Sequence, residues 1–271
     1  MKDFRDKLAY IVGGSSGIGL ATAGLMAQDG ANVIIFGRRQ QILDEALKQI
    51  KTHAVSSGQI FAGRSMDVSK RESVESVLTS SLAEYGAPDV LINCAGRAYP
   101  HCFEDISYEQ FDETMKTNLY GIWNTCSVLV PPMKAKGGAI VNVSSMAGFL
   151  GVFGYCDYAA SKFAIVGFSE TLKSELRRYN ISVHVLCPPD TDTPGFATEN
   201  LTKPAETRAI SAGAKVMTSE AIARAMLAGI RKNTFMITPG FDGKLTYFLK
   251  RHMPFIIDMF MTSAINKIQK K

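Results

Sequence analysis

Short apolar runs alternate with helical patterns along most of the chain. The runs are rich in Val, Ile and Leu, and a run such as 90–93 reads as a strand buried on both faces. Between the runs, apolar residues recur at three- and four-residue spacing, as in Ile42, Leu43, Ala46 and Ile50. The pattern predicts strands at residues 8–12, 33–36, 59–63, 90–93, 139–143, 182–187 and 235–238.

The intervening patterns predict helices that connect these strands. We expect them at about 18–28, 40–53, 74–82, 111–133, 158–179 and 219–232. Repeated alternation of strand and helix is typical of the α/β class, with a Rossmann-like, doubly wound parallel sheet covered by helices on both faces. No linker divides the chain, so residues 1–271 are expected to form a single domain.

The alternation is broken at residues 188–217, where the pattern predicts no strand. A long connection at the carboxyl ends of the strands usually forms a lid over the substrate, and we expect that here. Residues 241–271 form an apolar and basic extension. Its amphipathic pattern is equally consistent with two placements. The segment could pack on the domain or on a dimer partner, or it could make peripheral contact with a membrane interface.

Composition excludes several classes of protein. The 271 residues are 46% hydrophobic with mean hydropathy +0.04, which is incompatible with wholesale disorder. A net charge of +5 is too mild for a nucleic-acid-binding protein. The five cysteines form no CxxC pair and the four histidines are scattered, so neither a disulfide framework nor a metal site is expected. The basic N-terminus lacks a following apolar run, which favours a cytoplasmic rather than a secreted protein.

A glycine-rich turn separates the first strand from the first helix. Glycine permits a tight turn and lets backbone N–H groups approach a pyrophosphate, and the helix N-terminus adds a favourable dipole. One such motif alone is weak, but this one stands at the right junction of a strand–helix series. The residues expected to bind the dinucleotide here are Gly13, Ser15, Ser16, Gly17, Ile18 and Gly19.

The residues after the second strand favour NADP(H) over NAD(H). Arg38 and Arg39 stand where an acidic residue would bind the ribose 2′-OH of NAD, and a guanidinium can engage a 2′-phosphate instead. The alternative is a solvated arginine pair at a helix start. Further cofactor contacts are expected where the third and fourth strands end, although either site could be an ordinary turn. These residues are Asp67, Val68, Asn93, Ala95 and Gly96.

Four residues form a candidate catalytic group. Tyr158 and Lys162 are four positions apart on one helix, so they share a face, and an ammonium near a phenol lowers its pKa from ~10. A YxxxK pair alone also arises by chance on exposed helices. Ser145 lies just past the fifth strand, where its hydroxyl can bond the reacting oxygen. Asn118 precedes that strand and could hold a water near Lys162.

Together, these motifs resemble the short-chain dehydrogenases/reductases over residues 7–240. The matching residues are the glycine turn, Asn93-x-Ala95-Gly96, Asn118, Ser145 and Tyr158-x3-Lys162. The resemblance implies that Tyr158 is the general acid/base, Lys162 lowers its pKa and binds the nicotinamide ribose, Ser145 orients the carbonyl and Asn118 completes a proton relay. Tyr155 lacks a matching lysine and is expected to line the site. The cofactor-contacting set is also expected to include Pro188, Thr191 and Thr193.

A narrower resemblance lies in the lid. Pro188-Pro189-Asp190-Thr191-Asp192-Thr193-Pro194-Gly195-Phe196, with Glu199-Asn200 and Thr202-Lys203-Pro204, is similar to the 3-ketodihydrosphingosine reductases. This resemblance implies NADPH-dependent reduction of a long-chain keto amine, the second step of sphingoid-base synthesis. The apolar run after Ser145, residues 147–154, fits a long-chain lipid substrate, or else core or an oligomer interface.

Other functions stay open at this point. The same chemistry could act on a steroid, retinal or a 3-oxoacyl thioester, and a non-catalytic NADP(H)-binding regulator is the alternative of another class. The resemblance also implies a homo-oligomer, a dimer or tetramer, paired through the two long helices at about 111–133 and 158–179.

Overall fold

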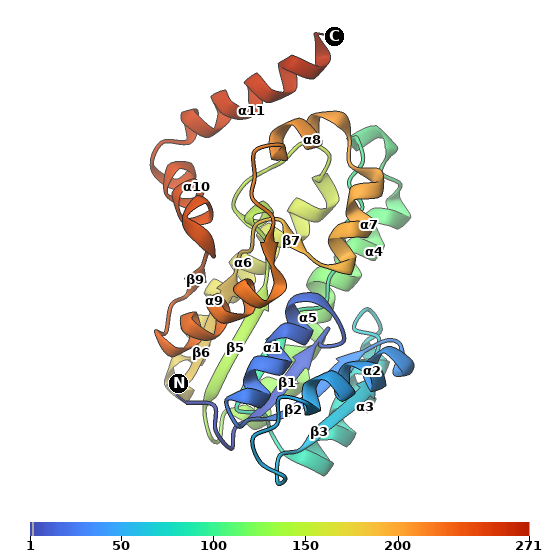
Figure 1. The fold of residues 1–271 in the computed structure, drawn as a ribbon, viewed down its shortest axis with the longest axis vertical. Coiled ribbons are helices and arrows are strands. Elements are labelled where there is room, and N and C mark those ends of the chain that lie inside the picture. Colours follow the sequence, from blue (N-terminus) through green and yellow to red (C-terminus); the bar gives the residue numbers. More distant parts are fainter. Residues whose placement is uncertain (2, 271) are drawn as a thin grey trace.

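The computed structural model describes Met1 and residues 3–270, and it is a helix-covered parallel sheet (Figure 1). The strands of the main sheet are β1 (Leu8–Val12), β2 (Asn32–Gly37), β3 (Phe61–Ser65), β4 (Val90–Asn93), β5 (Gly138–Val143), β6 (Ile181–Leu186) and β9 (Met236–Ile237). Their order is β3-β2-β1-β4-β5-β6-β9, and every pairing is parallel. The order reverses between β1 and β4, which is where a doubly wound sheet opens a crevice for ligands. The predicted fold class is confirmed.

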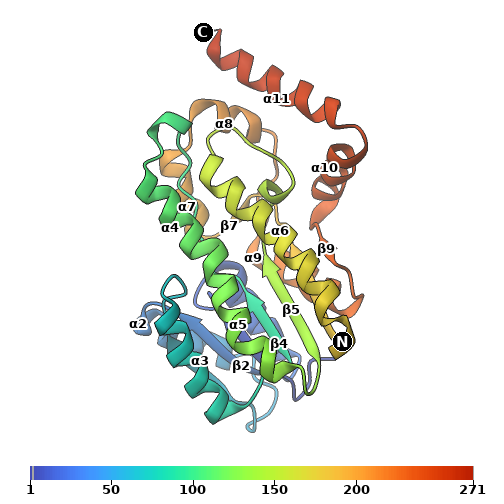
Figure 2. The same cartoon turned by 180° about the vertical axis from the view of Figure 1, so that it is seen from behind.

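Helices cover both faces of this sheet. The helices α1 (Gly17–Gln28), α2 (Gln40–Lys51) and α9 (Ser219–Arg231) lie on the face seen in Figure 1. On the opposite face, shown in Figure 2, lie α3 (Arg71–Tyr85), α5 (Gly121–Met133) and α6 (Cys156–Leu176). The sheet is therefore the middle of three layers.

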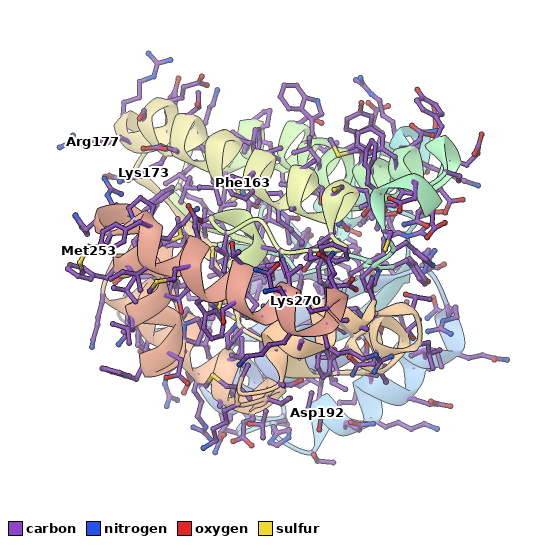
Figure 3. All side chains as sticks on the ribbon, turned by 90° about the horizontal axis from the view of Figure 1, so that it is seen from above. Phe163, Lys173, Arg177, Asp192, Met253 and Lys270 are labelled. Carbon is purple, nitrogen blue, oxygen red and sulfur yellow. The ribbon has the colours of Figure 1, made fainter. Side chains whose placement is uncertain are left out.

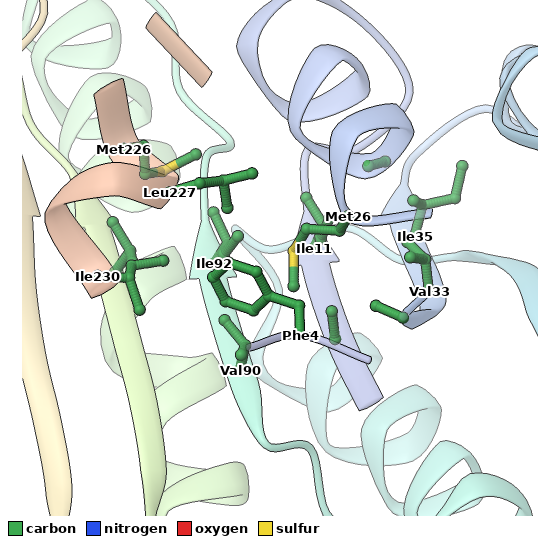
Figure 4. Close-up of a cluster of buried hydrophobic side chains, with 14 of the residues drawn as sticks. Phe4, Ile11, Met26, Val33, Ile35, Val90, Ile92, Met226, Leu227 and Ile230 are labelled. Atoms are coloured by element: carbon green, nitrogen blue, oxygen red, sulfur yellow. The ribbon is translucent and has the colours of Figure 1, made fainter. Parts of the chain in front are cut away.

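The three layers explain why the strands are mostly apolar. Successive side chains point to opposite faces, so Ile11 and Ile35 join one apolar cluster while Tyr10 and Ile34 join the other. Figure 4 shows the first cluster, in which residues of α9 meet β1, β2 and β4. Because both faces are covered by helices, the residues of the central strands β1 and β4 are buried whichever way they point, whereas β3 at the edge of the sheet is only partly buried.

A buried polar network fixes the carboxyl ends of β4 and β5. Asn93 Nδ2 donates to Asn142 Oδ1 at 2.9 Å, and Asn93 Oδ1 accepts from Thr125 on α5 at 2.7 Å. Asn142 in turn donates to Ser169 on α6 at 2.9 Å. Asn93 thus ties neighbouring strand ends together, and the network fixes two strands and two helices directly beneath the site.

The long predicted helix at 111–133 is interrupted. It begins as α4 (Tyr108–Met115), passes through a π-helical turn at Lys116–Tyr120 and continues as α5. A π-turn inserts one residue into a helix and is frequent at functional sites. Smaller differences are that β3 begins two residues later than expected and that α6 starts at Cys156.

The expectation that residues 188–217 contain no strand was wrong. Two-residue strands β7 (Thr191–Asp192) and β8 (Met217–Thr218) pair in parallel and close the base of the lid. Between them lie α7 (Pro194–Thr202) and α8 (Ala205–Ser211). A two-residue strand carries no periodicity of its own, so only its pairing partner reveals it.

The C-terminal extension forms two helices, α10 (Gly240–His252) and α11 (Pro254–Gln269). Viewed from above in Figure 3, α11 runs across the molecule from Met253 toward Lys270. It packs on the lid helix α8 and on α10, yet Phe241, Phe255 and Met259 stay exposed. Within the described residues, no helix is both long and apolar enough to cross a membrane.

Candidate active site

The glycine turn is packed so tightly that its glycines are required. Gly13 and Gly17 have positive φ of 80° and 52°, which disfavours other residues. A Cβ on Gly19 would lie 2.2 Å from the Gly13 carbonyl oxygen, and one on Gly13 would lie 2.6 Å from the Ala95 nitrogen. The turn therefore presents bare backbone at the N-terminus of α1, which begins after the extended Ser16, and this suits a pyrophosphate.

Other predicted cofactor residues surround this turn. A Cβ on Gly17 would lie 2.8 Å from Thr193 Cγ2, so the start of the lid stands against the phosphate turn. Thr191 is buried and donates to the Pro189 carbonyl at 2.7 Å, while the Pro188 carbonyl accepts from Met146 N at 3.1 Å. The structure thus brings the lid, the glycine turn and the segment after β5 together at one edge of the sheet.

The two arginines lie at the end of β2, close to the same turn. Both are exposed, and neither forms an ion pair with another described residue. A Cβ on Gly37 would lie 3.2 Å from Ser15 Oγ, so the Ser15 hydroxyl is beside the strand end that carries Arg38. Two free guanidinium groups and a hydroxyl make a suitable donor set for a phosphate.

Asp67 and Val68 occupy the end of β3. One carboxylate oxygen of Asp67 accepts from Ser69 N at 3.1 Å and from Ser69 Oγ at 2.7 Å, as in a turn. The Val68 side chain is buried, and its carbonyl accepts from Asn124 Nδ2 at 3.1 Å. Asp67 therefore has a structural role already, and its contact with the cofactor stays a prediction.

The candidate catalytic residues converge beyond the end of β5. Lys162 is 3% exposed, and its ammonium donates to the Val143 carbonyl at 2.9 Å. It lies 5.4 Å from the ring centroid of Tyr158. Ser145 begins a short helical turn by accepting from Ala147 N at 3.1 Å, and it lies close enough to Tyr158 to influence that phenol. Ser145, Tyr158 and Lys162 therefore form one site, as the sequence predicts.

Asn118 joins this group from the π-helical turn. Its amide nitrogen donates to Arg97 O and Ser161 Oγ, both at 3.0 Å, and its oxygen accepts from Arg97 N at 2.8 Å. A Cβ on Gly96 would contact both Asn118 Oδ1 and Lys162 Nζ, so these atoms flank the same glycine. The side-chain amide links the end of β4 to α6, and its part in a proton relay stays a prediction.

The expected lowering of the Tyr158 pKa does not occur in this structure. Burial raises the pKa of Tyr158, and the charge of Glu199 raises it further, while Ser145 acts in the opposite direction. Burial also lowers the pKa of Lys162 to about 8. Tyr158 is half-buried, and the nearby ammonium does not outweigh the partial loss of water around its phenol.

Sequence reasoning missed a group of charged residues in the lid. Tyr155 is buried, its hydroxyl donates to Glu199 on α7, and its ring centroid is 5.6 Å from that of Tyr158. Glu199 also pairs with Lys203 at 3.0 Å. The four-residue spacing of Glu199 and Lys203 was the available signal. Only the packing of the lid reveals that Glu199 and Lys203 lie near Tyr158.

Comparisons with known proteins agree with this geometry. The model of the short chain dehydrogenase family matches residues 7–204. A 3-ketodihydrosphingosine reductase of Bos taurus is 39% identical over 86% of this chain and 71% of its own length. A 3-oxoacyl-[acyl-carrier-protein] reductase FabG of Chlamydia muridarum is 38% identical over 73% of this chain and 77% of its own.

A solved structure is also similar. The alcohol dehydrogenase of Thermococcus sibiricus, complexed with 5-hydroxy-NADP, has a TM-score of 0.73 and 26% identity, over 84% of this chain and 91% of its own.

Burial of Lys162 predicts that the stability of the protein depends on pH. The pKa of this lysine is about 8 in the folded protein against an ordinary value of 10.5, so between these pH values the unfolded chain binds more protons. The free energy of unfolding therefore rises with pH in this window. Relative to Lys162→Met, wild type should gain about 2–3 kcal/mol between pH 7.5 and 10, measured by urea denaturation. Parallel curves for the two proteins would contradict burial of the charge.

Proposed function

The chain belongs to the short-chain dehydrogenase/reductase family of oxidoreductases, and from this premise we propose that it reduces the 3-keto group of 3-ketodihydrosphingosine with NADPH. The observation that carries the proposal is the convergence of Ser145, Tyr158 and Lys162 beyond the end of β5, in a chain that is 39% identical over 86% of its length to a relative with that name. Homologues named 3-ketodihydrosphingosine reductase in three organisms support it.

The residues that would hold a nicotinamide dinucleotide fit that group. The pyrophosphate would lie against the glycine turn, and Arg38, Arg39 and Ser15 would face a 2′-phosphate. When bound, the cofactor supplies the hydride for the ketone carbon. Because NAD and NADP differ only at the 2′ position, the arginine pair is the feature that supports NADPH.

The chain's own residues handle the proton. Ser145 donates a hydrogen bond to the ketone oxygen, where negative charge develops as the carbon is reduced. Tyr158 gives its proton to that oxygen, and its raised pKa keeps the proton on the phenol until then. Lys162, anchored on the Val143 carbonyl, places a positive charge beside the phenolate that remains. Asn118 positions the helix that carries both residues, through Ser161.

Two surfaces support the proposed partners. Trp123, Tyr120 and Phe163 are exposed aromatic side chains on α5, the π-turn and α6, and they suit homo-oligomer contacts through these helices. Sedimentation as a monomer at micromolar concentration would contradict this.

The exposed apolar residues of α10 and α11, beside Lys250 and Arg251, suit peripheral contact with anionic membranes. Failure to float with anionic vesicles would contradict that contact.

The direct test of the function is NADPH oxidation by the purified protein with 3-ketodihydrosphingosine, alongside NADH and a panel of a steroid ketone, retinal and a 3-oxoacyl thioester. We expect the keto amine and NADPH to give the highest kcat/KM. Preference for the thioester, the substrate named for the FabG relative, would replace this proposal with an acyl reductase. Cofactor binding without turnover of any carbonyl would support a non-catalytic regulator.

Tyr158→Phe should reduce kcat by roughly 100- to 10,000-fold, because it removes the proton donor. NADPH binding, followed by cofactor fluorescence, should be largely retained. The matched control is Tyr179→Phe, at the far end of the segment that follows α6, which should keep wild-type activity. A kcat close to wild type in Tyr158→Phe would remove that residue from the mechanism.

Arg38→Glu should change cofactor selectivity. It removes a cation from the proposed 2′-phosphate site and introduces a carboxylate suited to a ribose hydroxyl. The ratio of kcat/KM for NADPH over NADH should fall roughly 10- to 100-fold, the effect of one charged hydrogen bond. Arg177→Glu, the same change on an exposed residue remote from the site, should keep the ratio. Equal ratios in wild type and Arg38→Glu would show that Arg38 does not select the cofactor.

A further inference from the structure

Three charged side chains lie together in the lid, and their charges do not cancel. Lys203 is 4% exposed at its side chain and contacts Glu199 at 3.0 Å and Asp190 at 3.7 Å. Two carboxylates around one ammonium leave one negative charge. Within this cluster, Asp190–Glu199–Lys203, the side chain of Glu199 is 15% exposed and that of Asp190 is 30% exposed, so Glu199 is the better shielded carboxylate. The charge of Glu199 is therefore only weakly screened.

The excess charge reaches the catalytic tyrosine. Tyr155 donates a hydrogen bond from its hydroxyl to Glu199 and packs its ring against that of Tyr158. Glu199 and Asp190 each raise the pKa of Tyr158, with Glu199 the larger of the two. The carboxylates of the lid thus act at the phenol hydroxyl, which is where a ketone oxygen must sit to receive its proton.

This arrangement opposes the reaction of an uncharged ketone. Proton donation leaves a phenolate at Tyr158, and the carboxylates of the lid make that phenolate less stable, against the favourable charge of Lys162 on its other side. A substrate that carries a positive charge next to its carbonyl would neutralise the excess. The keto amine of the proposed function has its protonated amine on the carbon adjacent to the ketone, so carbonyl and ammonium must bind side by side.

We propose that Glu199, assisted by Asp190, binds the substrate ammonium and so selects 2-amino ketones over neutral ketones. This inference rests on the proposed function, because it assumes that a keto amine is the substrate. Lys203 holds the carboxylates in place, and its contact with the ring of Phe196, 4.3 Å from the centroid, fixes it within the lid. Closure of the lid over the substrate then places the negative group beside the reacting carbon.

The test compares two substrates in Glu199→Gln, a nearly isosteric change that keeps an acceptor for Tyr155 and Lys203. The substrates are a 2-amino-1-hydroxy-3-ketone and the same ketone without the amine. The ratio of their kcat/KM values should fall roughly 10- to 100-fold in the variant, as for loss of one charged hydrogen bond. Glu220→Gln, the same change on an exposed glutamate of α9, should keep the wild-type ratio.

The outcomes separate the two proposals. If wild type reduces the amino ketone and Glu199→Gln lowers kcat/KM equally for both substrates, the cluster only holds the lid and the ammonium site is overturned. If wild type reduces other carbonyls but not the amino ketone, the proposed function fails and this inference fails with it. Retention of the wild-type ratio in Glu199→Gln also overturns the site.

A second measurement does not depend on turnover or on a folded variant. Octylamine and octanol are titrated calorimetrically into the full wild-type chain with NADP+ present. The amine should bind roughly 10- to 100-fold more tightly than the alcohol, since the two differ only in the charged group. Equal affinities, or tighter binding of octanol, would overturn the ammonium site.

Discussion

The site depends on the burial of one ammonium group. Lys162 is removed from water at the end of β5, where the Val143 carbonyl accepts a hydrogen bond from its ammonium at 2.9 Å. Burial of a charge costs free energy unless the surrounding groups form hydrogen bonds with it. Ser144 donates to the Lys162 carbonyl, and a Cβ on Gly148 would lie 2.9 Å from that same oxygen. The helix α6, which carries Tyr158, therefore packs closely against the segment that follows β5.

The charges around Tyr158 follow from this constraint. The phenol of Tyr158 is half-buried between two opposing charges. Lys162 on one side favours the phenolate, whereas the carboxylates of the lid on the other side raise the pKa. In this structure burial and the carboxylates prevail, which keeps the phenol protonated. A proton donor for a ketone must hold its proton at neutral pH, so the arrangement suits the reductive direction. The lid thus does more than exclude water, because it sets part of the charge balance.

Much of the fold could be predicted from the sequence, because the sheet is covered on both faces and its strands are continuous apolar runs. The glycine turn was equally visible, since its positive φ values leave little choice of residue. The π-turn at Lys116–Tyr120 and the pairing of β7 with β8 were not visible, because tertiary contacts such as those of Asn118 decide them. Likewise, the effect of Lys162 on Tyr158 was judged from spacing alone, whereas burial determines the direction of the pKa shift.

The most direct test of this account is the titration of Tyr158 itself. Protein labelled with carbon-13 at tyrosine Cζ would be titrated by NMR, with Tyr158→Phe to assign the resonance. Because burial and the lid carboxylates stabilise the neutral phenol, its pKa should lie above the ordinary value of about 10 in the enzyme alone. A pKa at or below that value would show that Lys162 controls the phenol, and would contradict the charge balance described here.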